Sequence, residues 1–310
     1  MLTNLGLILI GFFLLLKGGD YLVDGAVAIA QRAKLSPMVI GLTIVGFGTS
    51  VPELLVSIQA ALAGSSGIAI GNVVGSNIAN IALILGMTAI IAVCPASKQT
   101  LRIDMPFMMV AGIAFVAVAL SGTISRIAGL CGFLALVAFV VWQIRNSRKK
   151  NADSESEGSA PMPLWKALTM VLVSFAALVL GADWLVDGAR NIASTLGVPD
   201  RIIGLTIVAI GTSLPELFAS VMAARKGETD VAIGNVIGSY TFNILSVVGL
   251  SASVCPIEHT ADGFVFDYML MIALGLLLWL FLRTKYVLER WEGTILLLIY
   301  IFYIAKLIVF

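Results

Sequence analysis

The chain alternates long apolar stretches with short segments that carry most of its charged residues. A helix needs roughly 20 apolar residues to cross a hydrocarbon core of about 30 Å. Ten stretches approach or exceed this length: 3–28, 38–62, 68–93, 105–121, 126–144, 165–194, 201–224, 230–254, 265–283 and 291–309. The pattern predicts an all-α integral membrane protein with ten transmembrane helices and no soluble domain.

The composition supports this interpretation. Hydrophobic residues make up 59% of the chain and charged residues 12%, whereas a soluble domain has about 25% charged residues. No phosphate-binding loop and no basic patch for nucleic acid is present. The first stretch begins almost at Met1 without a basic segment or a small-residue cleavage site, so we expect it to be a span of the mature protein.

The basic residues indicate the orientation. Of the 19 Lys and Arg residues, 14 follow alternate spans: Arg32, Lys34, Lys98, Arg102, Arg145, Arg148, Lys149, Lys150, Lys166, Arg225, Lys226, Arg283, Lys285 and Arg290. Cytoplasmic loops carry the excess of basic residues. We therefore expect a multi-pass protein of the cell's inner (plasma) membrane with both termini extracytoplasmic and the segment 145–164 in the cytoplasm.

The chain contains an internal repeat. Residues 41–86 and 204–249 align without a gap at an offset of 163 positions, and 25 of the 46 positions are identical. The same offset pairs "DYLVDGA" at 20–26 with "DWLVDGA" at 183–189. We expect two five-helix repeats, 1–144 and 165–310, joined by a cytoplasmic linker at 145–164. Because each repeat has an odd number of spans, the second copy must cross the membrane in the inverted direction.

The most costly residues of these spans occur in both copies. Glu53 and Glu216 each follow a proline, Pro52 or Pro215, in a Gly-Thr-Ser-x-Pro-Glu sequence. Burying a carboxylate inside a bilayer costs roughly several kcal/mol of free energy. A proline inside a helix leaves a backbone carbonyl without its hydrogen-bond donor. Broken backbone at membrane depth is tolerated where it lines a cavity enclosed by protein. The pattern indicates an oxygen-rich cavity suited to hard cations such as Ca²⁺ and Na⁺.

A second segment of each repeat supplies further oxygens. Ser76 and Asn80 are four positions apart and share a helix face, as do Ser239 and Asn243. Inverted repeats bring such segments together near the midplane of a membrane transporter. The three cysteines do not have the spacing of a metal-binding motif, so the sequence gives no indication of sulfur ligands for a metal.

These segments resemble a known family. "GTSVPE", "GNVVGSNIAN", "GTSLPE" and "GNVIGSYTFN", in an inverted duplication, are similar to the two alpha-repeats of the calcium/cation antiporter superfamily, especially its bacterial sodium/calcium exchanger-like members. The resemblance implies alternating access, in which the first and sixth helices slide past an eight-helix body that holds four adjoining cation sites. The metal ligands it implies are Gly46, Thr49, Ser50, Glu53, Ser76, Asn80, Ala209, Thr212, Ser213, Glu216, Ser239 and Asn243.

One position departs from the family pattern. Many sodium/calcium exchangers have an aspartate where this chain has Asn243, so a third carboxylate is missing. Two glutamates carry a charge of −2, which one Ca²⁺ or two monovalent ions would neutralise. We expect exchange of Ca²⁺ for Na⁺. The alternative is a Ca²⁺/H⁺ antiporter in which Glu53 and Glu216 carry the protons.

Two other classes remain open from the residues alone. An intramembrane aspartyl protease also uses two acids on opposed helices, but it needs a close acid dyad. A passive cation channel would need no coupling ion. We expect no enzymatic activity, no cofactor, no nucleic-acid partner and no obligate protein partner, so that inorganic cations and the lipid bilayer are the only partners.

Overall fold

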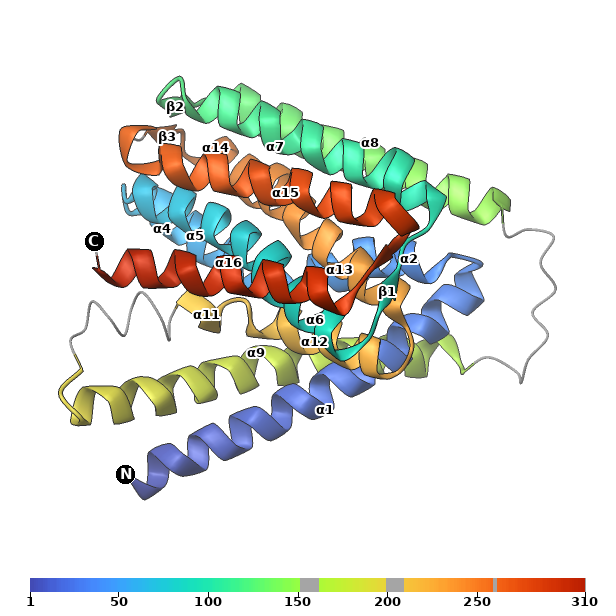
Figure 1. Ribbon diagram of the computed structural model, residues 1–310, viewed down its shortest axis with the longest axis horizontal. Coiled ribbons are helices and arrows are strands. Elements are labelled where there is room, and N and C mark those ends of the chain that lie inside the picture. Colours follow the sequence, from blue (N-terminus) through green and yellow to red (C-terminus); the bar gives the residue numbers. More distant parts are fainter. Residues whose placement is uncertain (151–161, 199–208, 259–260, 310) are drawn as a thin grey trace.

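The computed structural model describes residues 1–150, 162–198, 209–258 and 261–309 as a nearly all-helical bundle (Figure 1). The first half contains α1 (Leu2–Ala33), α2 (Pro37–Ile40), η1 (Gly41–Val45), α3 (Gly46–Thr49), α4 (Val51–Leu62), α5 (Ser66–Ala79), η2 (Asn80–Leu85), α6 (Gly86–Ile91), β1 (Cys94–Pro95), η3 (Thr100–Asp104), α7 (Met105–Ala119), β2 (Thr123–Ile124) and α8 (Arg126–Lys150). The second half contains α9 (Leu164–Thr195), α11 (Ala209–Gly211), α12 (Leu214–Arg225), α13 (Thr229–Phe242), η5 (Asn243–Val248), α14 (Gly249–Val254), β3 (Ile257–Glu258), η6 (Ala261–Phe264), α15 (Val265–Lys285), β4 (Val287–Leu288) and α16 (Arg290–Val309). The segments η1, η2, η3 and η5 are π-helical turns.

Most of the predicted spans are found. Within the described ranges, eight helices are long and apolar enough to cross a membrane, and a ninth span is formed by α2–α3 and α4, which meet at a bend of 45°. The predicted span 201–224 begins outside the described residues, and its described part consists of α11 and α12. Helix α8 continues to Lys150, so the basic residues that the sequence pattern assigned to the start of the linker belong to this helix.

The bend lies where the sequence predicts a broken helix. Ser50 has φ −85° and ψ 4°, and α4 starts at the next residue with Pro52 in its first turn. Ser213 has nearly the same conformation, φ −90° and ψ 3°, immediately before α12 and Pro215. Proline is accepted in a first turn because an amide there has no helical partner to lose. Both copies of the repeat therefore break at the same place.

The element boundaries repeat with the same offset as the sequence. Each of α4, α5, η2, α6 and β1 starts and ends 163 positions before α12, α13, η5, α14 and β3 respectively. Strand β1 pairs with β4, and β2 pairs with β3, so each short sheet joins the two halves. The equivalent strands β1 and β3 lie at opposite ends of the bundle (Figure 1). This arrangement is the one expected of inverted copies.

Two groups of helices form the bundle. α1 and α9 lie side by side along one edge, with backbone contact at Gly11 and Gly181 (Figure 1). The span formed by α13, η5 and α14 is the most enclosed, with 94% of its apolar window buried. Its α13 part packs against η1, α2 and α12, and its η5 and α14 parts pack against α8, so both broken helices contact this span.

Glycines set the distance between α13 and the α2–η1 segment. A Cβ atom at Gly234 would lie 2.5 Å from the Met38 carbonyl oxygen and 2.9 Å from the Leu42 amide nitrogen. A Cβ atom at Gly41 would lie 2.5 Å from the Val231 carbonyl oxygen. Side chains of any size would therefore force these backbones apart, and small residues permit the close approach.

We expect Gly234→Ala to destabilise the protein by about 1–3 kcal/mol, because the added methyl group overpacks a backbone contact. Gly71→Ala, at the equivalent position of the first repeat, is the matched control. There the nearest described atom to an added Cβ is a ring carbon of Phe264 at 3.6 Å, which is ordinary contact. Thermal denaturation in detergent measures both variants, and equal midpoints would contradict the packing account.

Candidate cation site

The two intramembrane glutamates lie in the first turns of α4 and α12, directly after the two helix breaks. Glu53 is 0% exposed and Glu216 is 1% exposed. The free amide groups of a helix start favour negative charge. The breaks thus place both acids at buried positions with partial positive charge behind them.

Hydroxyl groups of the first repeat face the acid of the second. Ser50 Oγ donates to Glu216 Oε1 at 3.5 Å. Thr49 Oγ1 lies 3.4 Å from Ser239 Oγ and donates to Asn235 Oδ1 at 3.3 Å. Both hydroxyls are buried, so polar groups of two distant segments share one enclosed region.

A backbone carbonyl joins this cluster. The Gly46 carbonyl oxygen accepts from Ser239 Oγ at 3.4 Å and from Thr49 Oγ1 at 3.5 Å. A Cβ atom at Gly46 would lie 3.0 Å from the Ser239 amide nitrogen, so glycine allows α3 to approach α13 this closely. The predicted residues Gly46, Thr49, Ser50, Glu216 and Ser239 are therefore in contact.

Two asparagines that the sequence patterns did not single out bond the helices just after the breaks. Asn72 Nδ2 donates to the Glu53 carbonyl oxygen at 3.1 Å and to Ser57 Oγ at 2.9 Å. Asn235 Nδ2 makes the same pair of bonds in the second repeat, at 3.2 Å to Glu216 O and 2.9 Å to Ser220 Oγ. Both belong to the repeated "IGNV" sequence, and their identity in the two copies was the available signal.

Several buried oxygens of this region have no hydrogen-bond partner within the described part of the chain. They are both carboxylate oxygens of Glu53, Oε2 of Glu216, Oγ of Ser213, Oδ1 of Asn80 and Oδ1 of Asn243. Burying such groups without a partner costs free energy, so the native site needs something that satisfies oxygen acceptors. Carboxylate, amide and hydroxyl oxygens are the donor set that Ca²⁺ and Na⁺ prefer. The residues present fit hard cations.

The remaining predicted ligands are less closely connected. Ser76 is buried on α5, and Asn80 is buried where η2 begins. Asn243 Nδ2 donates to Asn77 Oδ1 at 3.1 Å. Ala209 is the first described residue of α11, and nothing is described of its side chain. In the described ranges, no three or more His, Cys, Asp or Glu side chains are placed to hold a metal ion together, so a cation here depends on neutral oxygens beside two acids.

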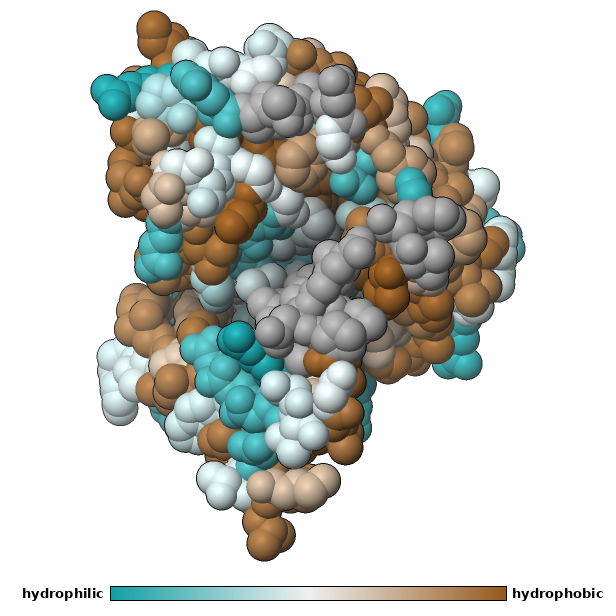
Figure 2. Space-filling model, turned by 90° about the vertical axis from the view of Figure 1, so that its left-hand side faces the viewer, coloured by the Kyte–Doolittle hydropathy of each residue, from teal (hydrophilic) through white to brown (hydrophobic). Residues whose placement is uncertain are grey.

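One side of the region is open. Thr212 is half-buried and lines a cavity of about 170 Å³ between α4, α9 and α12, together with Pro52 and Asp183. The bundle end that carries both chain termini is hollowed, with hydrophilic residues within the hollow (Figure 2). The cavity lies toward this end because Val56 and Val186, further along α4 and α9, also line it.

The opposite side is closed. A Cβ atom at Gly19 of α1 would lie 2.8 Å from the Phe218 carbonyl oxygen of α12. The position equivalent to Gly19 in the second repeat is Ala182, which lines the open cavity. Equivalent helix pairs, α1 with α12 and α9 with α4, are thus in close contact at one end and separated at the other.

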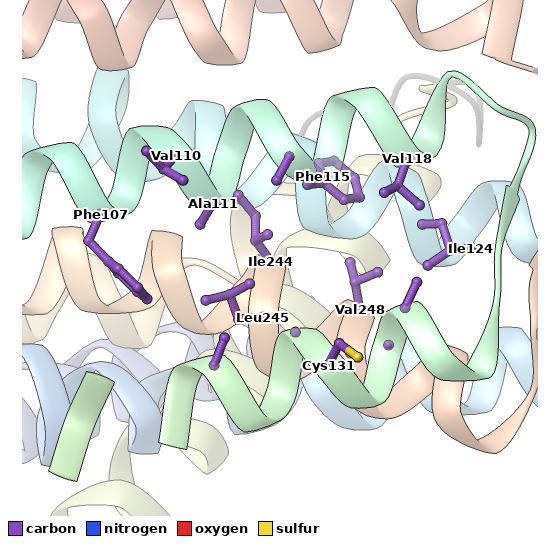
Figure 3. A pocket seen from close by; sticks show the side chains of 16 residues that line it. Phe107, Val110, Ala111, Phe115, Val118, Ile124, Cys131, Ile244, Leu245 and Val248 are labelled. Carbon is purple, nitrogen blue, oxygen red and sulfur yellow. The ribbon is translucent and has the colours of Figure 1, made fainter. Parts of the chain in front are cut away.

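A second cavity is unsuited to ions. A crevice of about 410 Å³ lies between α7 and α8, with Ile244, Leu245 and Val248 of η5 at its base (Figure 3). Its lining residues carry no charge, and Val110 at its edge is 65% exposed. An apolar crevice between two spans faces hydrocarbon and provides no cation ligands.

Comparisons with known proteins agree on one family. The sodium/calcium exchanger protein family model matches residues 3–145 and 166–309. A sodium/calcium exchanger, MaX1 of Methanosarcina acetivorans, is 35% identical over an alignment of 346 residues that covers 99% of this chain and 98% of the relative. Inner membrane protein YrbG of Escherichia coli K12 is 33% identical over 292 residues, covering 89% of this chain and 88% of the relative. The solved structure of the sodium-calcium exchanger NCX_Mj soaked with Na⁺ and Sr²⁺ superposes with a TM-score of 0.85 at 31% identity, covering 98% of each chain.

Proposed function

This chain belongs to the sodium/calcium exchanger family, and we propose that it exchanges Ca²⁺ for Na⁺ across the membrane by alternating access. The observation that carries the proposal is the pair Glu53 and Glu216, buried on two equivalent broken helices among oxygens that have no partner in the described chain. Intramembrane carboxylates of this kind mark ion pathways. Their ligand set would be the twelve positions named from the family resemblance.

The charge of the site bears on the coupling ion. Two ionised glutamates are neutralised by one Ca²⁺ or by two monovalent ions, whereas three Na⁺ would leave an excess charge in a poorly solvated region. Asn243, being neutral, adds no third negative charge. Several neutral oxygens lie beside the acids, and Na⁺ requires such ligands whereas a proton requires one oxygen. We therefore favour Na⁺ over H⁺ as the coupling ion.

One end of the bundle is open and the other is closed, and the basic residues indicate which side of the membrane each end faces. We propose ten spans in two inverted repeats within the inner membrane, with both termini extracytoplasmic and the segment after α8 cytoplasmic, because basic residues cluster at that end. In this orientation the cavity beside Thr212 opens outward and the contact between α1 and α12 closes the cytoplasmic side. Return to the inward-open state would separate α1 from α12 and bring α9 against α4.

The surroundings of the two acids differ from those of a catalytic acid pair. The acids of an aspartyl protease share a proton in a close dyad with a water molecule between them and the substrate. Here Ser50 Oγ donates to Glu216 Oε1, and the hydroxyls of Thr49 and Ser239 contact each other close by, which suits ion coordination. We propose that the protein is not an enzyme and uses no cofactor, with inorganic cations as its substrates.

We expect Glu53→Gln and Glu216→Gln each to abolish Ca²⁺ uptake into proteoliposomes, because each removes half of the formal charge of the site at nearly constant volume. Glu292→Gln is the matched control, since this glutamate is also buried, at 3% exposure, but its Oε2 accepts from the backbone amide of Glu289 at the other end of the repeat. Uptake near the wild-type rate in either site variant, with the protein folded in detergent, would refute the assignment.

The coupling ion is tested by imposing one gradient at a time. An outward Na⁺ gradient at fixed pH should drive ⁴⁵Ca uptake, and a pH gradient without Na⁺ should not. Asn243→Asp should raise the number of monovalent ions moved per Ca²⁺, because it adds a negative charge to the site. If only the pH gradient drives uptake, the protein is a Ca²⁺/H⁺ antiporter with Glu53 and Glu216 as proton carriers.

A further inference from the structure

Each repeat carries a pair of aspartates four positions apart on its first long helix. Asp20 and Asp24 lie on α1, and Asp183 and Asp187 are their equivalents on α9. This spacing places both carboxylates of a pair on one helix face. None of the four belongs to the proposed cation ligands, so the pairs have no role in the site described above.

The two pairs differ in their surroundings. Lys226, at the C-terminal end of α12, places its ammonium nitrogen 2.8 Å from Asp20 Oδ1 and 2.6 Å from Asp24 Oδ1, and it also donates to the Asp20 carbonyl oxygen at 2.7 Å. The equivalent of Lys226 in the first repeat is Ala63. Both residues cap their helices with nearly the same backbone angles, φ −84° and ψ −2° for Lys226 and φ −79° and ψ 1° for Ala63. The difference is therefore one of side chain alone.

Lys226 is the counter-ion of a cluster of acidic residues from α1 and from the segment that follows α12. Partial burial lowers the pKa of Lys226, but hydrogen bonds from the ammonium to Asp20 and Asp24 outweigh this effect and hold the pKa above its ordinary value. Glu228 lies near Asp24 and Asp230, and burial together with these two charges raises its pKa. Without the lysine, Asp24 of α1 would lie near Glu228 without the ammonium group that now bonds both Asp20 and Asp24. The positions equivalent to Glu228 and Asp230 in the first repeat are Ser65 and Gly67, which carry no charge.

The ion pairs span a contact that alternating access must break. Lys226 moves with α12, whereas Asp20 and Asp24 move with α1, and these helices touch at Gly19 and Phe218. When the opposite end closes, α9 would approach α4, but Ala63 offers no cation to Asp183 and Asp187. We propose that Lys226 is a one-sided latch that binds the α1 carboxylates only while the linker end is closed, and so biases the protein toward the state open at the termini end. The latch rests on the alternating access of the proposed function.

The expected effect is moderate. The side chains of the three residues are partly exposed, at 25% for Lys226, 28% for Asp20 and 46% for Asp24. An exposed ion pair changes an equilibrium by at most about fivefold. Two pairs sharing one lysine should therefore shift the ratio of the two states by about three- to tenfold.

The test measures conformation and not transport. The full-length protein, with Cys94, Cys131 and Cys255 replaced by alanine, receives a single cysteine at Val56, which lines the open cavity. In proteoliposomes without Ca²⁺, Lys226→Met should lower the rate of labelling by an impermeant thiol reagent added at the termini end, because the open-to-closed ratio that sets this rate falls by about three- to tenfold. Lys226→Arg should keep the wild-type rate.

The repeat provides a gain-of-function variant. Ala63→Lys places a lysine at the equivalent capping position, from which it would meet Asp183 and Asp187 when α9 approaches α4, so it should stabilise the opposite state and also lower the labelling rate. In the double variant Ala63→Lys, Lys226→Met the decrease should be larger than in either single variant. Adding Asp20→Asn and Asp24→Asn to Lys226→Met should restore much of the wild-type rate, because the repulsion among the carboxylates is relieved.

Lys285→Met is the control, because Lys285 is also paired, with Glu289 at 2.8 Å, but within one segment of the chain. Unchanged labelling in Lys226→Met, or an equal decrease in Lys285→Met, would overturn the latch while leaving exchange intact. A cysteine at Val56 that reacts in no variant would overturn the access route and the latch with it. Na⁺-driven Ca²⁺ uptake, measured on the same samples, separates failure of the latch from failure of the proposed function.

Discussion

A carboxylate buried in hydrocarbon must be neutralised, and the arrangement of this bundle follows from that requirement. Glu53 and Glu216 are placed in the first turns of two helices that start after a break, where helix amides partly offset their charge. Just after each break, the backbone carbonyl of the glutamate itself accepts a hydrogen bond from an asparagine of the next helix, Asn72 for Glu53 and Asn235 for Glu216. The oxygens left over define where cations belong.

The inverted repeat buries one acid in each half of the chain, and contacts between the two halves build a shared site. Hydroxyls of the first repeat contact the acid and the serine of the second, and each short sheet pairs a strand of one half with a strand of the other. Glycine contacts close one half of the pathway while the equivalent half is open. A single static arrangement of two equivalent copies thus contains both a closed and an open gate.

The sequence predicted most of the spans and the helix breaks because both depend on local properties. Long apolar stretches have no other stable location, and proline fixes the break at the same place in α4 and α12. It did not reveal the role of Asn72 and Asn235, because an asparagine in a polar motif gives no sign of which distant carbonyl it bonds. The extension of α8 to Lys150 was missed because helix formation continues past the apolar boundary. The contacts of Lys226 with Asp24 and Asp20 of α1 join residues 202 and 206 positions apart, which no local pattern indicates.

The central claim is that a cation lies between the two glutamates and takes oxygens from both repeats. Strontium is a direct probe because its anomalous scattering locates it in crystals of the protein, as a divalent substitute for Ca²⁺. The account predicts an anomalous peak within about 2.3–2.8 Å of oxygens from both Glu53 and Glu216, with Thr49 or Gly46 completing the shell. A peak that contacts neither glutamate, or a site formed by one repeat alone, would contradict it.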